Sequence, residues 1–562
     1  MDGPRKRTLI LSIAAALLLG LFHGAIGGEV SFDRLLKSDA DPDNWPTYYR
    51  NYQGWRYSPL TQISTQNVKK LVVKWAFSTG PDEGLETTPI VVDGVMYLTS
   101  EKNAVFALDA ATGRPLWRHV YELPENLPRF WNRVDRGVAV AEGKILHGTL
   151  DAYLMALDAK TGSVLWKVRV GDYEAGETFT SPPLIIRDKA IVGLGTREYP
   201  GRGFIDAYEI NTGKLVWRTY TIPAPGEPGH ETWGSGDAWR YGCAAAWLPG
   251  TYDAELNLVY LATSQPCPGF DGEVRPGDNL YADSILALDP ETGTLKWYFQ
   301  LIPHDVWELD ATTELILVDV AVEGRPVKAV LLAGKNGFFY VLDRTNGRFL
   351  HAKPFVSRIT WTKGLDRQGR PIPDAVPTRD GAILCPSAWG AKNWNHAAFS
   401  PRTGYVYVPA IDLCFETRLA PAKPQKGVVY FGGMLTQIQE DPHGSLVAID
   451  PTTGETKWRY RSPYPMFSSV LTTAGGLVLT GDAVGNALAF EASTGQLLWT
   501  FNTGSGHRGS PITYAVNGRQ HVAIPAGMPP RVANRLASWY PELNGYPLVG
   551  STLFVFGLSE SE

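Results

Sequence analysis

The phrase ALDAATGRPLW, which begins at Ala107, returns five times along the chain and decides the fold. The other copies are ALDAKTGSVLW from Ala156, AYEINTGKLVW from Ala207, ALDPETGTLKW from Ala287, AIDPTTGETKW from Ala448 and AFEASTGQLLW from Ala489. Two degenerate copies, VLDRTNGRFLH from Val341 and FSPRTGYVY from Phe399, bring the number of units to eight. Intervals of roughly 40 to 80 residues between such units are typical of a repeat architecture.

Each copy has the pattern of a β-hairpin. A strand ends at an acid, a Thr-Gly or Asn-Gly turn follows, and a second strand closes on a bulky residue that is usually tryptophan. Eight hairpins, each extended by two more strands, predict an all-β, eight-bladed propeller with tryptophan-docking repeats. We assign the repeated Gly to positive-φ turn positions and the repeated Trp to packing between blades, not to catalysis.

The composition agrees with one large, loop-rich β domain. Apolar residues make up 44% of the 562 residues and charged residues only 19%, while 58 Gly and 41 Pro supply turns. We expect a single domain over residues 28–562, with few, short helices and with the last strand, STLFVFGL, pairing with an N-terminal strand to close the ring. A net charge of −5 provides no basic field for nucleic-acid binding.

The first residues are typical of a secretory signal peptide, predicted to cover residues 1–27. Three basic residues from Arg5 to Arg7 precede an apolar run from Leu9 to Phe22, and small residues follow at Ala25 and Gly27. The mature chain is therefore expected in the periplasm. The alternative is an uncleaved membrane anchor, although the run is shorter than the ~20 apolar residues that a span needs. No later segment has the character of a membrane span.

Four cysteines in an oxidising compartment favour disulfides. Cys385 and Cys414 flank the sixth unit, and Cys243 and Cys267 flank a strand pair between the third and fourth units, so we expect these two pairings. Three connectivities are formally open, as are free buried thiols. The chain contains no C-x-x-C-H motif, so it carries no c-type haem attachment site of its own.

Five stretches resemble one enzyme family in its own order: the tryptophan-bearing repeat, GDAW with the later YDAELNLVY, RPGDN, PHDVW and KNGFFYVLDRTNG. They are similar to the quinoprotein alcohol dehydrogenases, the pyrroloquinoline quinone (PQQ) enzymes that include methanol and ethanol dehydrogenases. The resemblance runs from about Asn44 to the C-terminus.

The resemblance implies a set of cofactor-binding residues. Trp247 matches the indole floor beneath PQQ, and Phe467 lies where the family commonly has a tryptophan near the substrate. The remaining cofactor-binding positions, which match donors, cations and an acid of the family, are Glu86, Arg136, Thr180, Lys335 and Asn393.

The resemblance also implies a cation that joins the quinone to the protein and acts as a Lewis acid. Glu198 matches a metal ligand, and Gln265 stands where the family usually has Asn, with its amide oxygen one methylene further out. Asp310 lies where lanthanide-using members carry an extra acid, although it is equally suited to a loop hydrogen bond. With Glu308 these oxygens make either Ca²⁺ or a lanthanide ion plausible.

Glu308 stands where the family has a catalytic Asp. Asp and Glu have nearly the same base strength, so Glu308 can accept the alcohol proton. The added methylene can displace the carboxylate by about 1 Å, at a cost on the order of 100-fold in rate. A second departure is that Phe130 and Trp131 stand where many members have a vicinal disulfide above the cofactor.

Our first interpretation is a periplasmic PQQ-dependent dehydrogenase that oxidises a primary alcohol or related hydroxyl compound, with Glu308 as base. Electrons would pass to a separate soluble cytochrome c, and family members are often homodimers. Two alternatives stay open: a propeller without turnover that serves as a binding or assembly module, and a PQQ dehydrogenase for sugars or polyols.

Overall fold

The computed structural model describes residues 30–80, 84–127, 133–195, 198–437 and 441–559. The signal peptide expected at residues 1–27 and the aromatic pair Phe130 and Trp131 lie outside the described residues. Helices in the described part are few and short, as the sequence predicts. They are α1 (Phe32–Leu36), α2 (Pro530–Trp539) and the single 3₁₀ turns η1 (Ser38–Ala40), η2 (Val68–Lys70), η3 (Tyr173–Ala175), η4 (His230–Trp233), η5 (Ala238–Tyr241), η6 (Gly272–Val274) and η7 (Pro541–Leu543).

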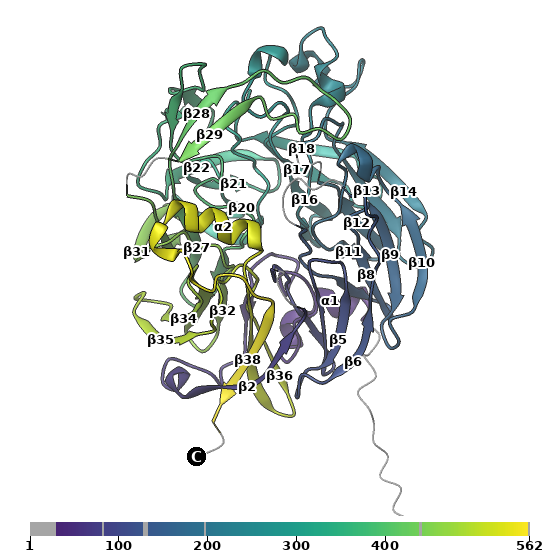
Figure 1. Cartoon of the computed structure of the whole chain (residues 1–562), viewed down its shortest axis with the longest axis vertical. Coiled ribbons are helices and arrows are strands. Elements are labelled where there is room, and N and C mark those ends of the chain that lie inside the picture. Colours follow the sequence, from purple (N-terminus) through teal and green to yellow (C-terminus); the bar gives the residue numbers. More distant parts are fainter. Residues whose placement is uncertain (1–29, 81–83, 128–132, 196–197, 438–440, 560–562) are drawn as a thin grey trace, which may run out of the picture.

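Strands build eight sheets of four or five strands each, which follow one another around a central region in the order of the chain (Figure 1). From the N-terminus they comprise β3 (Ile90–Val92), β4 (Val95–Thr99), β5 (Val105–Asp109) and β6 (Pro115–His119); β7 (Ala139–Ala141), β8 (Lys144–Gly148), β9 (Tyr153–Asp158) and β10 (Val164–Arg169); β11 (Leu184–Ile186), β12 (Lys189–Gly193), β13 (Phe204–Glu209) and β14 (Leu215–Tyr220); β15 (Thr251–Asp253), β16 (Leu258–Ala262), β17 (Ser284–Leu288) and β18 (Leu295–Gln300).

The second half of the chain continues the series. It comprises β19 (Ile316–Val322), β20 (Arg325–Ala333), β21 (Phe338–Asp343) and β22 (Arg348–Pro354); β26 (Ala398–Ser400), β27 (Tyr405–Asp412), β30 (His443–Asp450) and β31 (Glu455–Ser462); β32 (Leu471–Thr473), β33 (Leu477–Gly481), β34 (Asn486–Glu491) and β35 (Leu497–Asn502) with the short β1 (Tyr57–Ser58); and β36 (Ile512–Val516), β37 (Arg519–Ala526), β38 (Thr552–Leu558) and β2 (Leu71–Ser78). Neighbouring strands are antiparallel except β1 and β32, which pair in parallel.

The repeat phrase forms the turn between the third and fourth strands of a sheet. In the first copy the Asp109 carboxylate accepts hydrogen bonds from the backbone of Ala111 and Thr112, and Gly113 adopts φ +74°. Seven of the eight phrases occupy this position. The exception is the copy from Phe399, which joins the first two strands, β26 and β27, of the sheet that already contains the AIDPTTGETKW copy. Counting phrases as one per sheet was therefore wrong at this copy.

The eighth sheet contains no copy of the phrase and is built from both ends of the chain. Strand β38 pairs along its length with β2, from Leu71 opposite Leu558 to Ser78 opposite Thr552. This confirms the predicted pairing of the last strand with an N-terminal strand.

Neighbouring sheets contact each other through the repeated tryptophans. The Trp117 indole packs over Gly162 of the next copy, where an added Cβ atom would lie 2.5 Å from the ring, and its Nε1 donates to the Ala159 carbonyl at 3.0 Å. Trp166 and Trp217 make the same backbone contact with the following sheets. The glycine is needed here because any side chain would collide with the indole.

Antiparallel order sorts the connections onto two ends of the ring. Turns between strands one and two, or three and four, lie at one end, where the repeat phrases are found. Turns between strands two and three, and connections from the fourth strand to the next sheet, lie at the other end. All eleven predicted site residues belong to connections of the second kind, so the topology gathers them at one end.

That end also has smaller elements. A two-stranded sheet joins β23 (Thr362–Leu365) to β24 (Pro371–Pro373), and a three-stranded sheet contains β25 (Ala382–Leu384), β28 (Phe415–Leu419) and β29 (Gly433–Gln437). Helix α2, yellow in Figure 1, extends inward to the edge of the central region and packs in one apolar cluster with Phe415 and Phe467.

Both predicted disulfides are present, Cys243–Cys267 and Cys385–Cys414. Among the helices of the described residues, none is both long and apolar enough for a bilayer.

Candidate functional site

A cavity of about 200 Å³ opens at this end of the ring and gathers most of the predicted site residues. Nine of the eleven line it: Arg136, Thr180, Glu198, Trp247, Gln265, Glu308, Asp310, Lys335 and Asn393. They come from eight connections spread over more than 250 positions of sequence, since Arg136 precedes β7 and Asn393 precedes β26. The tertiary structure therefore brings the predicted cofactor, metal and catalytic positions into one space.

Trp247 presents its indole to the cavity from the connection between β14 and β15. Its Nε1 lies 3.4 Å from an Asp310 oxygen, and the Arg136 guanidinium lies 5.1 Å from the ring centroid. The Cys243–Cys267 disulfide joins the two segments that carry Trp247 and Gln265, and Ala244 N donates to the Gln265 carbonyl at 3.2 Å. The flat ring and the amide are thus positioned by one crosslinked unit.

Glu308 is held by a tight loop after β18. The Asp305 carboxylate accepts hydrogen bonds from the backbone N–H groups of Trp307, Glu308 and Leu309, at 2.6, 3.1 and 2.8 Å. Glu308 itself has φ +64°, a left-handed conformation that is costly for a residue with a side chain. Three backbone donors on one buried carboxylate compensate for this conformation and set the direction of the Glu308 side chain.

The acids of the cavity surround one ammonium group. Lys335 Nζ lies 2.8 Å from an Asp310 oxygen and 3.9 Å from a Glu308 oxygen. Burial raises the pKa of Glu308 well above its ordinary value, Lys335 opposes that rise, and the nearby Glu198 and Asp310 carboxylates add to it. Burial acts to lower the pKa of Lys335, but the Asp310 and Glu308 charges outweigh it and raise that pKa. The site has an excess of buried negative charge that a cation would stabilise.

The oxygens present fit a hard cation as a partial ligand set. Gln265 Nε2 donates to Glu308 at 2.9 Å, while the buried Oε1 of the same amide has no hydrogen-bond partner among the described residues. An amide oxygen without a donor beside two carboxylates suits Ca²⁺ or a lanthanide ion. However, no three His, Cys, Asp or Glu side chains of the described chain are grouped closely enough to hold a metal ion alone. A cation held here would take further oxygen ligands from amide or backbone carbonyls, water or the carboxylates of a cofactor.

Polar atoms on the opposite wall are also unsatisfied. The buried Thr180 Oγ1 and Arg136 Nε have no hydrogen-bond partner within the described chain. Arg136 donates from Nη1 to the Thr180 carbonyl at 3.2 Å and lies 3.2 Å from a Glu86 oxygen. Burial without partners costs free energy, so these donors fit a polar, anionic cofactor lying on Trp247. Asn393 Nδ2 instead donates to the Trp389 carbonyl at 3.0 Å and braces its own loop.

Two predicted cofactor residues lie behind the cavity wall and do not line it. Glu86 is fully buried between Arg136 and Arg508, and Phe467 packs behind Trp389 with 5.6 Å between ring centroids. Their assignment to cofactor binding stays a prediction. In this structure Glu86 contacts Arg136 and Arg508, and Phe467 packs against Trp389, and these three partners line the cavity.

Sequence reasoning missed several lining residues: Ser264, Trp389, Trp394, Phe431, Leu435, Arg508 and Val532. Trp394 belongs to the KNWN motif, and Trp389 lies five positions before Trp394. Their closeness to Asn393 of the same motif could have indicated both as lining residues. Arg508 stands in SGHRGSP, outside the repeat phrase, and only its charge in a Gly-rich connection distinguished it.

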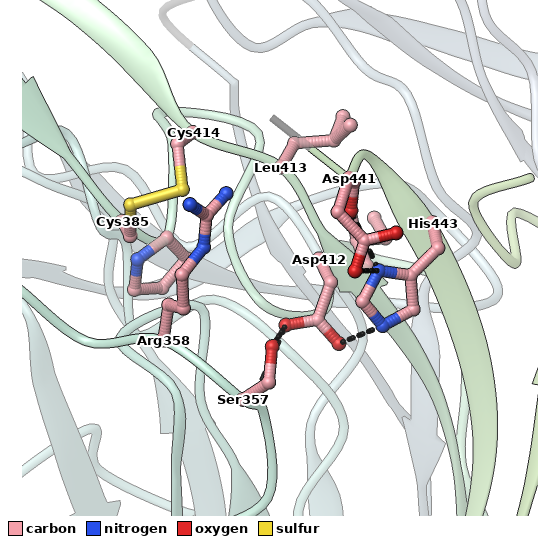
Figure 2. A pocket seen from close by; sticks show the side chains of 10 residues that line it. Ser357, Arg358, Cys385, Asp412, Leu413, Cys414, Asp441 and His443 are labelled. Atoms are coloured by element: carbon pink, nitrogen blue, oxygen red, sulfur yellow. Dashed lines mark hydrogen bonds and ion pairs between the residues drawn. A yellow bond between two sulfur atoms is a disulfide. The ribbon is translucent and has the colours of Figure 1, made fainter. Parts of the chain in front are cut away.

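A second cavity of about 380 Å³ lies beside the Cys385–Cys414 disulfide (Figure 2). Ser357 Oγ donates to Asp412 at 2.9 Å, and His443 Nδ1 lies 2.8 Å from the Asp441 carbonyl. None of the predicted site residues lines this larger cavity. The serine contacts the aspartate and not the histidine, so the arrangement does not activate a nucleophile, and size alone does not identify the functional site.

Comparisons with known proteins show which families this chain resembles. The family described as glucose/ethanol/alcohol dehydrogenase, beta-propeller domain, matches residues 45–353, and the one described as outer membrane protein assembly factor BamB matches residues 380–527. The quinoprotein alcohol dehydrogenase PedH of Pseudomonas putida is 39% identical, over 93% of this chain and 92% of that protein.

Two solved structures share the fold at 34% identity. A quinohemoprotein alcohol dehydrogenase, ADHIIG of Pseudomonas putida, superimposes with a TM-score of 0.89 over 96% of this chain and 84% of that one. A europium-containing methanol dehydrogenase superimposes with a TM-score of 0.88 over 94% of this chain and 100% of that one. Both similarities extend over almost the whole of this chain.

Proposed function

Because the chain belongs to the PQQ-dependent quinoprotein alcohol dehydrogenases, we propose that its 200 Å³ cavity oxidises a primary alcohol or related hydroxyl compound to an aldehyde or carbonyl. The observation that carries this proposal is the meeting of Trp247, Lys335, Glu308 and Gln265 in one cavity, although they lie far apart in sequence. The protein is an alcohol-oxidising oxidoreductase that uses PQQ with Ca²⁺ or a lanthanide ion.

The residues divide the reaction between them. Bound PQQ supplies a two-electron acceptor for the hydride of the alcohol carbon. Glu308, held by the Asp305 loop, takes the hydroxyl proton, so that hydride and proton both leave the alcohol and a carbonyl compound remains. Lys335 and Arg136 would hold anionic groups of the cofactor, Trp247 would offer its flat ring to it, and Thr180 and Asn393 would complete the wall. Glu198, Gln265, Glu308 and Asp310 would supply oxygens to the cation.

Several features of the cell biology and architecture belong to the same proposal. The eight sheets act as eight blades docked through their tryptophans, the N-terminal 27 residues direct the chain to the periplasm, and a soluble cytochrome c takes single electrons from the reduced cofactor. Relatives named quinohemoproteins support a cytochrome-type acceptor. We also propose a homodimer, as family resemblance suggests.

Reconstitution tests the function directly. Purified protein is loaded with PQQ plus Ca²⁺ or La³⁺, and reduction of an artificial dye is followed across primary alcohols, sugars and polyols. We expect cofactor absorbance in the protein and dye reduction with at least one primary alcohol. If neither ion gives cofactor absorbance, the enzyme proposal fails; if only polyols react, the sugar or polyol alternative is correct.

A second candidate is a binding or assembly module. The match of residues 380–527 to the assembly factor BamB favours it. Against it, a scaffold has no physical reason to bury Glu308 and Asp310 beside Lys335 in a cavity, since such groups cost desolvation energy. Protein that takes up no PQQ yet binds other envelope proteins would support this candidate.

A further inference from the structure

Arg508 is a buried cation on the cavity wall that the mechanism above does not use. It lies in the connection between β35 and β36, is 8% exposed, and lines the cavity. Its Nε donates to Glu86, which also lies 3.2 Å from Arg136. One buried carboxylate thus serves two guanidinium groups.

Most of the donor capacity of Arg508 is unused. A guanidinium has five N–H donors in a fixed fork, and only Nε has an acceptor among the described residues. The Nη1 and Nη2 atoms are also not sealed from solvent, unlike Nε of Arg136. The open edge of the fork has the geometry that binds a carboxylate through two parallel hydrogen bonds.

The surroundings of Arg508 differ from those of Arg136. The Arg508 guanidinium lies 5.4 Å from the Phe467 ring, 5.6 Å from Trp394 and 6.0 Å from Trp389. Arg136 lies 4.3 Å from Trp394 but also 5.1 Å from Trp247. Trp394 thus contacts both cations, with Arg136 next to the proposed cofactor floor and Arg508 next to the aromatic wall formed by Trp389 and Phe467.

The acids of the cavity do not compensate Arg508. Glu308 and Asp310 form ion pairs with Lys335 and none with Arg508. Among the described residues, the shared Glu86 is the one carboxylate that forms an ion pair with Arg508. Apolar rings around the fork lower the local dielectric and strengthen a charge-assisted hydrogen bond made there.

We propose that Arg508 binds the carboxylate of an anionic alcohol, so that hydroxy acids are the preferred substrate class of this cavity. The inference rests on the proposed function. The substrate hydroxyl is held at Glu308 and its carboxylate at the Arg508 fork, and two-point binding selects molecules that carry both groups. The cofactor's own carboxylates are the other source of the same chemistry, and the experiment separates the two.

The test compares matched substrates on the PQQ-loaded protein. The kcat/KM values are measured for ω-hydroxycarboxylates, from 3-hydroxypropanoate to 8-hydroxyoctanoate, and for the corresponding neutral ω-hydroxyamides. We expect the wild type to prefer the carboxylate, and Arg508→Gln to lower the carboxylate-to-amide ratio about tenfold or more. Arg508→Lys, which keeps the charge but loses the fork, should recover part of the ratio.

Two further measurements make the outcome specific. Calorimetric titration with hexanoate, which cannot be oxidised at an alcohol carbon, should show binding to the wild type and its loss in Arg508→Gln. Arg531→Gln, an exposed change on α2 beside the lining residue Val532, removes the same charge outside the cavity and should leave the ratio intact. If the carboxylate-to-amide ratio falls equally in Arg508→Gln and Arg531→Gln, long-range electrostatics explains the preference and the inference is overturned.

The remaining outcomes separate this inference from the proposed function. If Arg508→Gln weakens PQQ uptake and lowers kcat/KM equally for the hydroxycarboxylates and the hydroxyamides, Arg508 binds the cofactor and the inference is wrong. A wild type that oxidises neutral alcohols without preferring carboxylates also overturns it, while leaving the proposed function in place. A wild type that takes up no PQQ with either ion contradicts the proposed function itself.

Discussion

The side-chain amide of Gln265 donates from Nε2 to Glu308 at 2.9 Å, and its own buried Oε1 has no partner within the described chain. One amide therefore connects the proposed base to the proposed cation position. Both residues are longer by one methylene than their counterparts in the family pattern, and they contact each other directly.

Replacing Glu308 with Gln should abolish most turnover without unfolding the protein. The amide keeps the size and can still contact Gln265, but it cannot accept the alcohol proton. We expect kcat to fall by about 10² to 10⁴. Steady-state dye reduction measures kcat, and PQQ absorbance and the melting temperature verify that the site is loaded and folded. Retention of more than a tenth of the wild-type kcat in loaded protein would show that another group is the base.

Gly269→Ala should impair catalysis through the position of Glu308. A Cβ atom at Gly269 would lie 2.9 Å from Glu308 Cγ, so the carboxylate has to move. A displacement near 1 Å predicts a loss on the order of 100-fold in kcat. Gly236→Ala is the matched control, because a Cβ there meets nothing within 4 Å. Similar kcat values for the two variants would contradict the proposed importance of this contact.

The two disulfides should differ in their effect on the cofactor. The bridges close comparable loops, with separations of 24 and 29 residues, so each Cys→Ser pair should lower the free energy of unfolding by about 2–4 kcal/mol. The Cys243→Ser/Cys267→Ser pair should also weaken PQQ binding, because that bridge joins the segments of Trp247 and Gln265. Urea unfolding and PQQ titration measure the two effects. A larger loss of PQQ affinity in Cys385→Ser/Cys414→Ser would refute this assignment.

Low pH should destabilise the protein through a buried network next to Asn393, formed by Lys392, Glu314 and His396. Burial lowers the pKa of His396 from an ordinary 6.5 to about 3. Burial alone would raise the pKa of Glu314, but Lys392 and His396 lower it to about 2. In both cases the side chain takes up a proton at a higher pH in the unfolded chain than in the folded protein. Stability is therefore lost as pH falls, from about 6.5 to 3 for His396 and from about 4.5 to 2 for Glu314.

Variants identify the His396 contribution. Urea unfolding between pH 7 and 4 should give a free energy that declines with acid, and His396→Gln should reduce the slope by up to about 1.4 kcal/mol per pH unit, the equivalent of one proton. His230→Gln is the control, because that half-buried residue of the 3₁₀ turn η4 contacts Pro223 and Trp239, which do not belong to this network. An unchanged slope in His396→Gln would mean that His396 does not stay neutral in the folded state.

Much of the fold was readable from the sequence because a hairpin is a local structure. The acid and the Thr-Gly turn of the ALDAATGRPLW phrase interact within a few residues, so each copy predicts its own turn, whereas the closing Trp contacts the next copy. The sheet that lacks the phrase, made of β2 and β36–β38, was predicted only through its unpaired last strand. The copy from Phe399 misled the count because the same local turn also suits the first two strands of a sheet.

The site residues were predictable in kind through family resemblance, but their arrangement was not. Glu86 and Phe467 match family positions, yet their depth behind Arg508 and Trp389 depends on side chains from distant connections. The pairing of Gln265 with Glu308 and the placement of Arg508 also arise from such long-range packing.

The sequence by itself determined that the chain forms hairpins in series and that its irregular connections carry the chemistry, because turn signals and motifs act over short stretches. Only the tertiary structure decided which side chains share the cavity. Antiparallel sheets bring every second connection to one end of the ring, and neighbours across that end can be hundreds of residues apart.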